Sequence, residues 1–541
     1  MDPENMALIE NSIYRRAVTN VSTWGDTDVF PFPIENHVMH DRPDDVINLL
    51  ADLAKNFDER IKQPVHSYST LAPVGYTGFR WATQVDPLWN TYLLSLVLSM
   101  ANEIESSRIP ESEGRVYSYR FRPDGEDGLF SQDGWRLFQE RSRELATTSS
   151  YVVTVDIADF YSRVYHHRLE NALRRLDPGA NKTRQIMAIL SKLSNNTSYG
   201  LPVGGPAARL LAELVLDPVD HLLLADPDAR DFCRYADDYR FFVKDIQSAY
   251  QAIGFLSEKL LRNEGMALQK SKTRIMTSSE YLSMLDPVNP EPGSAAKFLG
   301  LHIHFDPYSA TPEEDYVRLR DQLNEFDILG LLRDELSKGR VHAALARRLI
   351  AALELMDPGP RGQAVMSLME NIETLSPVVP QVMRAVRGYI DNNGGDDTIE
   401  IVQSRIRELI ASRHYLARID LNLSYMVRAL AGKHTLANEQ MLIQLYNANH
   451  GFGSGTAPNI QRDIMLTMAR WDVRYWISDQ KNYVNFVHPW VRRAFIIASY
   501  ILQDEGKHWR ESNKPGMTGL DISVRDWAAE KRNTSGWRVP V

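Results

Sequence analysis

The sequence predicts an α+β fold followed by a mainly α-helical C-terminal domain with the character of a helical-repeat array. Tyr151–Ile157 is a run of apolar and β-branched residues typical of a buried strand. Phe232–Val243 is a second strand region, interrupted at Ala236–Asp238. Beyond about Pro307 the pattern changes to amphipathic helices separated by short Pro, Gly and Asp breaks.

The composition describes a globular chain without a strong overall charge. Its 541 residues are 43% apolar, and 61 Lys and Arg against 70 Asp and Glu give a net charge of −9. No overall basic field draws such a chain to nucleic acid, so a nucleic-acid role must depend on local surfaces. The single cysteine, the start without a signal-peptide pattern and the lack of a long apolar stretch predict a soluble cytoplasmic protein with no membrane contact. Because the length exceeds one core, we expect three parts: 1–150, 151–310 and 311–541.

The first 150 residues mix helical, extended and looped patterns. Trp24–Pro33 cannot be a helix because its prolines lack donors and favour extended neighbours. Apolar residues at helical spacing predict helices over Asp44–Ile61 and Leu88–Ile104. Between them, Gly75–Trp81 predicts a glycine-bent loop. After the second helix, Arg115–Arg122 alternates like a strand.

The middle and C-terminal parts contain further helical patterns. Three in the middle are Arg163–Leu176, Pro206–Leu224 and Ile246–Glu264. Those of the C-terminal part are Asp315–Lys338, Val341–Met356, Gly362–Leu375, Pro380–Ile390 and Thr398–Ile410. The last 70 or so residues carry six of the ten tryptophans. They recur at helix-like spacing with polar residues between them, which favours helix packing over the alternative of stacking on single-stranded nucleic acid.

Acidic residues follow or interrupt the two expected strands. Asp156 ends the first strand, and Asp237 and Asp238 lie in the bend of the second. Carboxylates brought together at strand ends suit two Mg²⁺ ions, which prefer oxygen ligands and can activate an attacking hydroxyl and stabilise a departing pyrophosphate. For an isolated Asp-Asp pair, the plainer alternative is a turn in which aspartate is common.

The order of motifs around these aspartates resembles that of the reverse transcriptases. The resemblance rests on five segments in sequence: Val155–Tyr161, Gly200–Pro206, Tyr235–Asp238, Leu268–Thr273 and Phe298–Leu301. It implies a right-hand polymerase fold, with fingers within residues 1–150 and a palm over 151–310. It also implies RNA-directed DNA synthesis from dNTPs.

Residue roles follow from this resemblance. Asp156, Asp237 and Asp238 would bind two Mg²⁺ ions, or Mn²⁺, with the backbone carbonyl of Ile157 as an extra ligand. Lys272 aligns with a lysine that protonates pyrophosphate in the family. Tyr161 aligns with the residue that packs beneath the sugar and rejects a 2′-hydroxyl; the alternative is a core aromatic.

Other residues are candidates for contacts to the nucleotide. Gly204 and Gly205 allow a close backbone approach to a base pair, whereas Val203 replaces the glutamine of many relatives, so that contact is absent. The triphosphate needs cations, and we expect them from the Arg115–Arg122 segment, where guanidinium groups pair well with phosphate. The alternative is a solvent-facing strand edge. The candidates are Arg115, Arg120 and Arg122.

A finer resemblance concerns the bacterial abortive-infection and defence-associated reverse transcriptases, also called the unknown group. It rests on Val203–Gly205, Gly25–Pro33 and Gly75–Trp81, with the helical C-terminal domain. It implies an antiphage role, assembly as a trimer or hexamer, and RNA or single-stranded DNA as partners. Some members act without a template or start the strand on a protein tyrosine. Nothing in the sequence selects such a tyrosine; Tyr14, Tyr76 and Tyr446 are examples only.

Three functions therefore stay open at this point. The leading one is an RNA-directed or template-independent DNA polymerase in antiphage defence. The second is a protein-primed terminal transferase that makes single-stranded DNA with the same metal site. The third is a non-enzymatic palm that serves as an assembly or RNA-sensing scaffold.

Overall fold

A computed structural model describes residues 9–25, 29–123, 128–227, 229–285, 295, 298, 323, 326–453, 455–484 and 487–541. The chain divides into two compact units. The first contains Met1–Ser69 and Ala82–Asp286, and the second contains Thr70–Trp81 and Pro287–Val541. The boundary expected after residue 150 lies inside the first unit. The segment Phe298–Leu301 lies outside the described residues except for Phe298, which is buried against Phe326.

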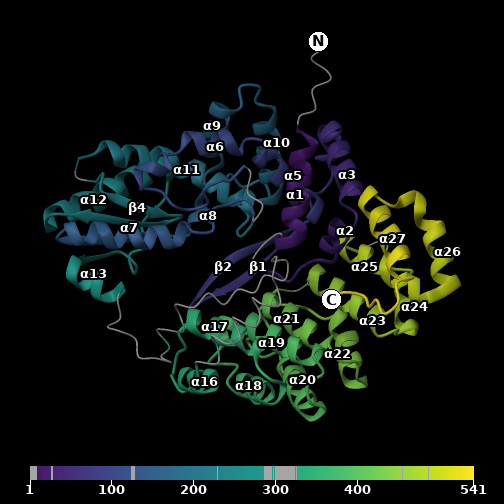
Figure 1. The fold of residues 1–541 in the computed structure, drawn as a ribbon. Coiled ribbons are helices and arrows are strands. Elements are labelled where there is room, and N and C mark those ends of the chain that lie inside the picture. Colours follow the sequence, from purple (N-terminus) through teal and green to yellow (C-terminus); the bar gives the residue numbers. More distant parts are fainter. Residues whose placement is uncertain are drawn as a thin grey trace. The chain divides into compact units, whose positions relative to one another are not determined.

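The first unit begins with a group of packed helices (Figure 1). They are α1 (Asn11–Trp24), α2 (Ile34–Asp41), α3 (Pro43–Lys55), α4 (Phe57–Arg60), α5 (Pro87–Leu98) and α6 (Ala101–Ser107). Helix α1 packs against α2, α3 and α5 through residues such as Val18 and Val21, which are fully buried. The helices predicted over Asp44–Ile61 and Leu88–Ile104 are confirmed, each with a break. The predicted absence of helix over Trp24–Pro33 is confirmed for its described residues Gly25 and Val29–Pro33, whereas Trp24 is still the last residue of α1.

A two-stranded hairpin lies between α4 and α5. It consists of β1 (Ser67–Val74) and β2 (Gly78–Val85). Gly75 has φ of 64° at the turn, a left-handed conformation that glycine adopts without strain. The prediction of a loop over Gly75–Trp81 is wrong beyond this turn, because Gly78–Trp81 continues as strand.

The centre of the first unit is a four-stranded antiparallel sheet. Its order is β4 (Phe232–Tyr235), β5 (Asp238–Val243), β3 (Tyr151–Asp156) and β6 (Arg274–Thr277). Both strand regions predicted from the sequence are confirmed, including the interruption between Tyr235 and Asp238.

Helices cover both faces of this sheet. Side chains alternate between the two faces along each strand, and both faces carry apolar side chains that must be buried. On one face Val153 and Phe241 join the main core with residues of α11 (Pro206–Ala225) and α12 (Ile246–Lys259). On the other face Val152 and Phe242 pack with α7 (Gly134–Thr148) and α13 (Ser278–Leu285). Helices α7 and α12 therefore flank the sheet from opposite sides (Figure 1).

The segment Arg115–Arg122 is not a strand. Only isolated bridges form, from Val116 to Arg234 and from Phe121 to Phe130, and Tyr119 has φ of 46°. A left-handed residue interrupts an extended run, so alternation alone was misleading here. The remaining helices of the unit are α8 (Phe160–Arg163), α9 (His166–Leu176) and α10 (Asn181–Leu193).

From residue 326 onward, the described part of the second unit is built from helices, as the sequence predicts. The start of the helix predicted over Asp315–Lys338, residues 315–325, lies outside the described residues except for Leu323. The described α-helices of this unit are α16 (Ile328–Leu336), α17 (Ala343–Ala352), α18 (Pro358–Glu370), α19 (Val379–Asp391), α20 (Asp396–Ala411), α21 (Asp420–Leu430), α22 (Leu436–Tyr446), α23 (Pro458–Arg470), α24 (Arg474–Gln480), α25 (Pro489–Ala498), α26 (Gln503–Asn513) and α27 (Gly519–Lys531). Trp490 and Trp527 are buried between these helices, which supports packing as their role. Among the residues described, no helix combines the length and apolarity that crossing a membrane would require.

Candidate polymerase active site

Two of the predicted metal ligands face each other across neighbouring strands. In the β3–β5 pair, Asp156 lies directly opposite Asp238. Side chains opposite each other in an antiparallel pair have Cβ atoms about 4.5–5.5 Å apart. Asp237 occupies the bend just before β5, and its backbone carbonyl accepts a hydrogen bond from the amide of Ile157 at 3.1 Å. The strands thus bring together carboxylates that are distant in the sequence.

The bend that carries Asp237 is held from beneath by a buried arginine. Arg234 Nη1 donates to the carbonyl oxygen of Ala236 at 2.9 Å, where Ala236 has φ of 54°. The same guanidinium donates to both carboxylate oxygens of Asp220 and to Glu213. A left-handed alanine is unfavourable by itself, so this hydrogen bond helps to fix the conformation of the bend.

A wider network of buried charges surrounds Arg234. Glu213 also accepts from Arg108 Nη2 at 2.6 Å, and the hydroxyl of Tyr239 donates to Asp220 at 3.0 Å. Two guanidinium groups and two carboxylates thus balance, as buried charges require. Because Glu213 and Asp220 lie on α11, the network ties this helix to the bend of the aspartates.

The negative charges of the carboxylates at the surface of the site are less completely neutralised by neighbouring cations. Burial raises the pKa of Asp238 to about 6; the charges of Asp156 and Asp237 add to this, and Arg240, 3.9 Å away, opposes it. Burial and the charge of Asp156 also raise the pKa of Asp237. Lys272 Nζ pairs with Asp156 at 2.7 Å. A cation bound here would relieve the remaining repulsion.

The donor set suits a hard divalent cation. Within the described ranges, no group of three His, Cys, Asp or Glu side chains is close enough to form a complete metal site. Mg²⁺ usually needs only one or two carboxylates, since waters and substrate phosphates complete its octahedron. Asp156 and Asp238 with their neighbour Asp237 fit that partial role. The Ile157 carbonyl as a further ligand stays a prediction.

Tyr161 lies beside the glycine-containing turn, as the motif order predicts. Its carbonyl oxygen accepts a hydrogen bond from the amide of Leu201 at 2.9 Å. Burial raises the pKa of the Tyr161 hydroxyl well above its ordinary value, and the neighbouring Tyr119, Glu213 and Asp237 add to it while Arg209 opposes it. Tyr161 is therefore close enough to feel the charge of Asp237.

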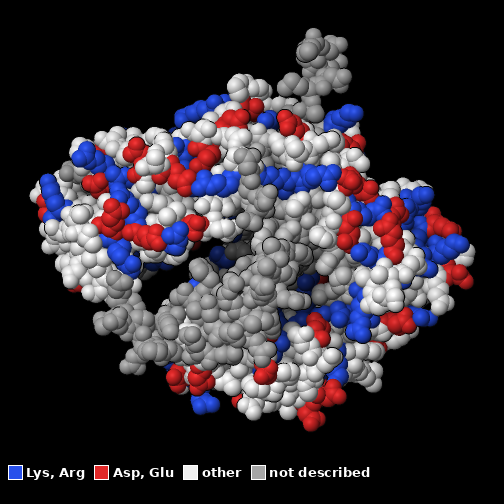
Figure 2. All heavy atoms as spheres, in the orientation of Figure 1, with Lys and Arg blue, Asp and Glu red and all other residues white. Residues whose placement is uncertain are grey.

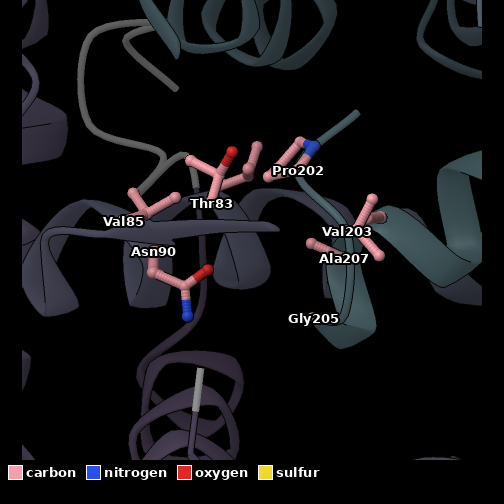
Figure 3. A pocket seen from close by; sticks show the side chains of 9 residues that line it. Thr83, Val85, Asn90, Pro202, Val203, Gly205 and Ala207 are labelled. Carbon is pink, nitrogen blue, oxygen red and sulfur yellow. The ribbon is translucent and has the colours of Figure 1, made fainter. Parts of the chain in front are cut away.

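The turn Gly200–Pro206 leads directly into α11. Gly204 has φ of 113°, which favours glycine at this position. Val203 and Gly205 line a small cavity of about 10 Å³ together with Thr83 and Asn90 (Figure 3). The cavity is near the lower limit for one water molecule. Val203 thus contributes an apolar wall to this cavity.

The three arginines expected to bind the triphosphate already have protein partners. Arg120 is buried and donates to Glu105 Oε1 and to the carbonyls of Val116 and Ile109, so its assignment as a phosphate ligand is wrong. The reason is that the segment is not a strand with one solvent-facing edge.

Arg115 and Arg122 also form ion pairs. Arg115 pairs with Asp231 at 3.1 Å, and Arg122 pairs with Glu111 at 2.9 Å. Arg209, which is not among the candidates expected from the sequence, lies near the site: its guanidinium is 5.1 Å from the centre of the Tyr119 ring, and its charge opposes the rise in the pKa of Tyr161. Its position one turn after Gly205 is the signal that could have identified it.

The tyrosines named as examples of a priming residue are not well placed for that role. Tyr14 and Tyr446 are buried, with 2% and 4% exposure. The hydroxyl of Tyr76 donates to the carbonyl of Thr374 and accepts from the amide of Val341.

Comparison with known proteins identifies the domain that holds this site. Residues 108–303 match the family model described as reverse transcriptase (RNA-dependent DNA polymerase). The chain therefore contains a reverse transcriptase domain, which indicates an RNA-directed DNA polymerase, a nucleotidyltransferase. The predicted reverse-transcriptase-type α+β fold with a helical C-terminal region is confirmed.

Two solved structures are similar only at a low level. One is telomerase from Candida albicans in complex with a fragment of telomeric RNA, with 11% identity, 68% coverage of this chain, 67% coverage of that chain and a TM-score of 0.32. The other is apo telomerase from Candida tropicalis, with 10% identity, coverages of 70% and 74%, and a TM-score of 0.31. No curated protein matches the chain.

Proposed function

We propose that this protein is a DNA polymerase of bacterial antiphage defence that joins dNTPs by two-metal nucleotidyl transfer. The observation that carries the proposal is the placement of Asp156 opposite Asp238, beside the bend with Asp237, inside a reverse transcriptase domain. The defence role is supported by the resemblance of Val203–Gly205 and the N-terminal motifs to the defence-associated group.

Each residue of the site has a definite task in this proposal. Asp156, Asp237 and Asp238 hold the divalent ions, either Mg²⁺ or Mn²⁺. When bound, such ions activate the attacking 3′-hydroxyl and neutralise charge on the phosphates. Lys272, whose Nζ lies 2.7 Å from Asp156 Oδ2, gives a proton to the departing pyrophosphate in this proposal. Tyr161 packs beneath the sugar of the incoming nucleotide.

The proposed polymerase also needs a template and a primer. RNA is the template that the domain type favours, whereas synthesis without a template or from a protein hydroxyl is the alternative. We also propose a homo-oligomer, a trimer or hexamer, on the basis of the same family resemblance. Figure 2 shows acidic and basic side chains interspersed on the visible face, so RNA or single-stranded DNA would have to bind at local basic surfaces.

Incorporation of labelled dNTPs by the purified chain tests the proposal. We expect Mg²⁺-dependent incorporation that rises with added RNA and is abolished by Asp237→Asn. Asp52→Asn, an exposed substitution on α3, is the matched control and should leave incorporation unchanged. Incorporation that is indifferent to RNA and nuclease would favour the terminal transferase. Phage protection that survives Asp237→Asn, with no incorporation by wild type, would favour a scaffold.

A further inference from the structure

The sheet face that carries the catalytic carboxylates also carries a row of basic residues. In the strand register, Thr154 of β3 lies opposite Arg240 of β5 on one side and Arg274 of β6 on the other. These residues are two positions along the strands from the Asp156–Asp238 pair, so all of them lie on one face. A carboxylate row is therefore followed by an arginine–threonine–arginine row.

The two arginines of this row differ in how they are held. Arg240 is almost buried, lies 4.0 Å from the centre of the Phe138 ring, and donates to the Tyr281 hydroxyl at 2.7 Å and to Gln139 at 3.1 Å. Arg274 is exposed on the edge strand β6, and in the described part of the chain it has no carboxylate partner. One cation is thus fixed in place, and the other is available to a ligand.

A cavity joins the two rows. It has a volume of about 310 Å³ and is lined by Thr154, Asp156, Asp238, Arg240, Lys272 and Arg274, with an apolar wall that includes Met276 and Tyr281. The carboxylates form one end and the arginines the other. A ligand that reaches from divalent ions at the aspartates into this cavity would place an anionic group next to Arg274.

We propose that Arg274, supported by Thr154 and Arg240, binds the phosphodiester of the growing strand that adjoins the reacting 3′ end. Residues two apart on a strand are separated by about 6.6 Å, which is comparable to the spacing of successive phosphates in a nucleic-acid strand. Guanidinium groups recognise phosphate by paired hydrogen bonds. The inference rests on the proposed function, since it takes the reacting end to lie at the aspartates.

The salt dependence of strand binding tests this site without any chemistry. A fluorescein-labelled single-stranded oligodeoxynucleotide is titrated with the full chain in EDTA, without dNTPs, over a series of KCl concentrations, and anisotropy gives the binding constant. Each phosphate contact contributes about 0.7 to the slope of log K against log salt for a single strand. We expect Arg274→Ala to reduce the slope by about 0.7 and Arg274→Lys to preserve it.

The matched control is Arg262→Ala. Arg262 follows α12, which covers the opposite face of the sheet, and it pairs with Glu258. The slope of log K against log salt for Arg262→Ala should equal that of wild type. An Arg274→Ala slope equal to that of wild type would overturn the proposal, and the Arg274→Lys variant shows whether any change comes from charge or from folding.

Pyrophosphate distinguishes the two sources of phosphate. In primer extension, we expect Arg274→Ala to raise the KM for primer and to leave both the KM for dNTP and inhibition by added pyrophosphate unchanged. Weaker pyrophosphate inhibition with an unaltered salt slope would mean that Arg274 contacts the leaving group, which overturns the assignment to the strand. If wild type incorporates no dNTP at all, the proposed function fails, whereas the slope measurement still decides the binding site.

Discussion

Replacing Asp238 by asparagine should stabilise the metal-free protein while removing its activity. The pKa of Asp238 rises from 3.8 to about 6 through burial and the charges of Asp156 and Asp237. A pKa shift of this size lowers the free energy of unfolding at pH 7 by at most about 3 kcal/mol. Because the side chain is 35% exposed, solvent screening reduces this to about 1 kcal/mol. For a unit of this size, that raises Tm by roughly 2–4 °C.

The sign of the pH dependence follows from proton linkage. Between the unfolded and folded pKa values, the folded state binds the Asp238 proton more tightly than the unfolded chain does. The contribution of Asp238 to the free energy of unfolding of the wild type is therefore fully present below about pH 4 and is lost as the pH rises through about 6. The gain in stability of Asp238→Asn over wild type should therefore be complete at pH 7 and small at pH 4.5.

Thermal unfolding in EDTA at both pH values measures this effect. Asp52→Asn is the control and should track wild type at each pH. Addition of Mg²⁺ at pH 7 should raise the Tm of wild type more than that of Asp238→Asn, because the variant has lost a ligand. A variant that is less stable than wild type at pH 7 without metal would refute the argument that burial and the neighbouring carboxylates destabilise the charged form of Asp238.

Three further substitutions test other parts of the site. Glu213→Gln should destabilise the chain by about 3–5 kcal/mol in urea unfolding, because Asp220 then remains as the one fully buried carboxylate beside the two guanidinium groups of Arg108 and Arg234; a loss below 1 kcal/mol would contradict this. Tyr161→Ala should admit ribonucleotides, measured as the ratio of rNTP to dNTP incorporation, and an unaltered ratio would place the sugar gate elsewhere. Lys272→Ala should lower kcat by about 100-fold if the lysine acts as a general acid, and a normal kcat would leave it only its ion pair with Asp156.

The candidate metal-binding aspartates could be located from the sequence because strand patterns determine where their side chains meet. Tyr151–Ile157 and Phe232–Val243 read correctly as strands, and their pairing places Asp156 opposite Asp238. The positions of the arginine side chains could not be predicted in this way. Arg120 lies in an alternating segment that resembles an exposed strand, but hydrogen bonds to Glu105 and to two carbonyl groups offset the cost of burying its charge.

Local patterns also failed where contacts depend on elements far apart in the chain. The helical pattern over Pro206–Leu224 correctly predicted α11, but not that Glu213 and Asp220 anchor Arg234. Two carboxylates seven residues apart on an apolar helix were the visible signal, because positions separated by two turns lie on one face. Their partner, the arginine just before the bend, could be assigned only from the fold.

The distribution of charge around the bend leaves the proposed metal site with more carboxylates than neighbouring cations. Beneath the bend, Arg234 is matched by Glu213 and Asp220, so its charge is already neutralised within the core. Above the bend, Lys272 pairs with Asp156, and Arg240 stands 3.9 Å from Asp238 while its Nη1 donates to Tyr281. Three carboxylates, those of Asp156, Asp237 and Asp238, thus have only Lys272 and Arg240 as cationic neighbours. A divalent ion that arrives with a phosphate-bearing substrate would complete the balance, so binding of metal and nucleotide should be mutually dependent.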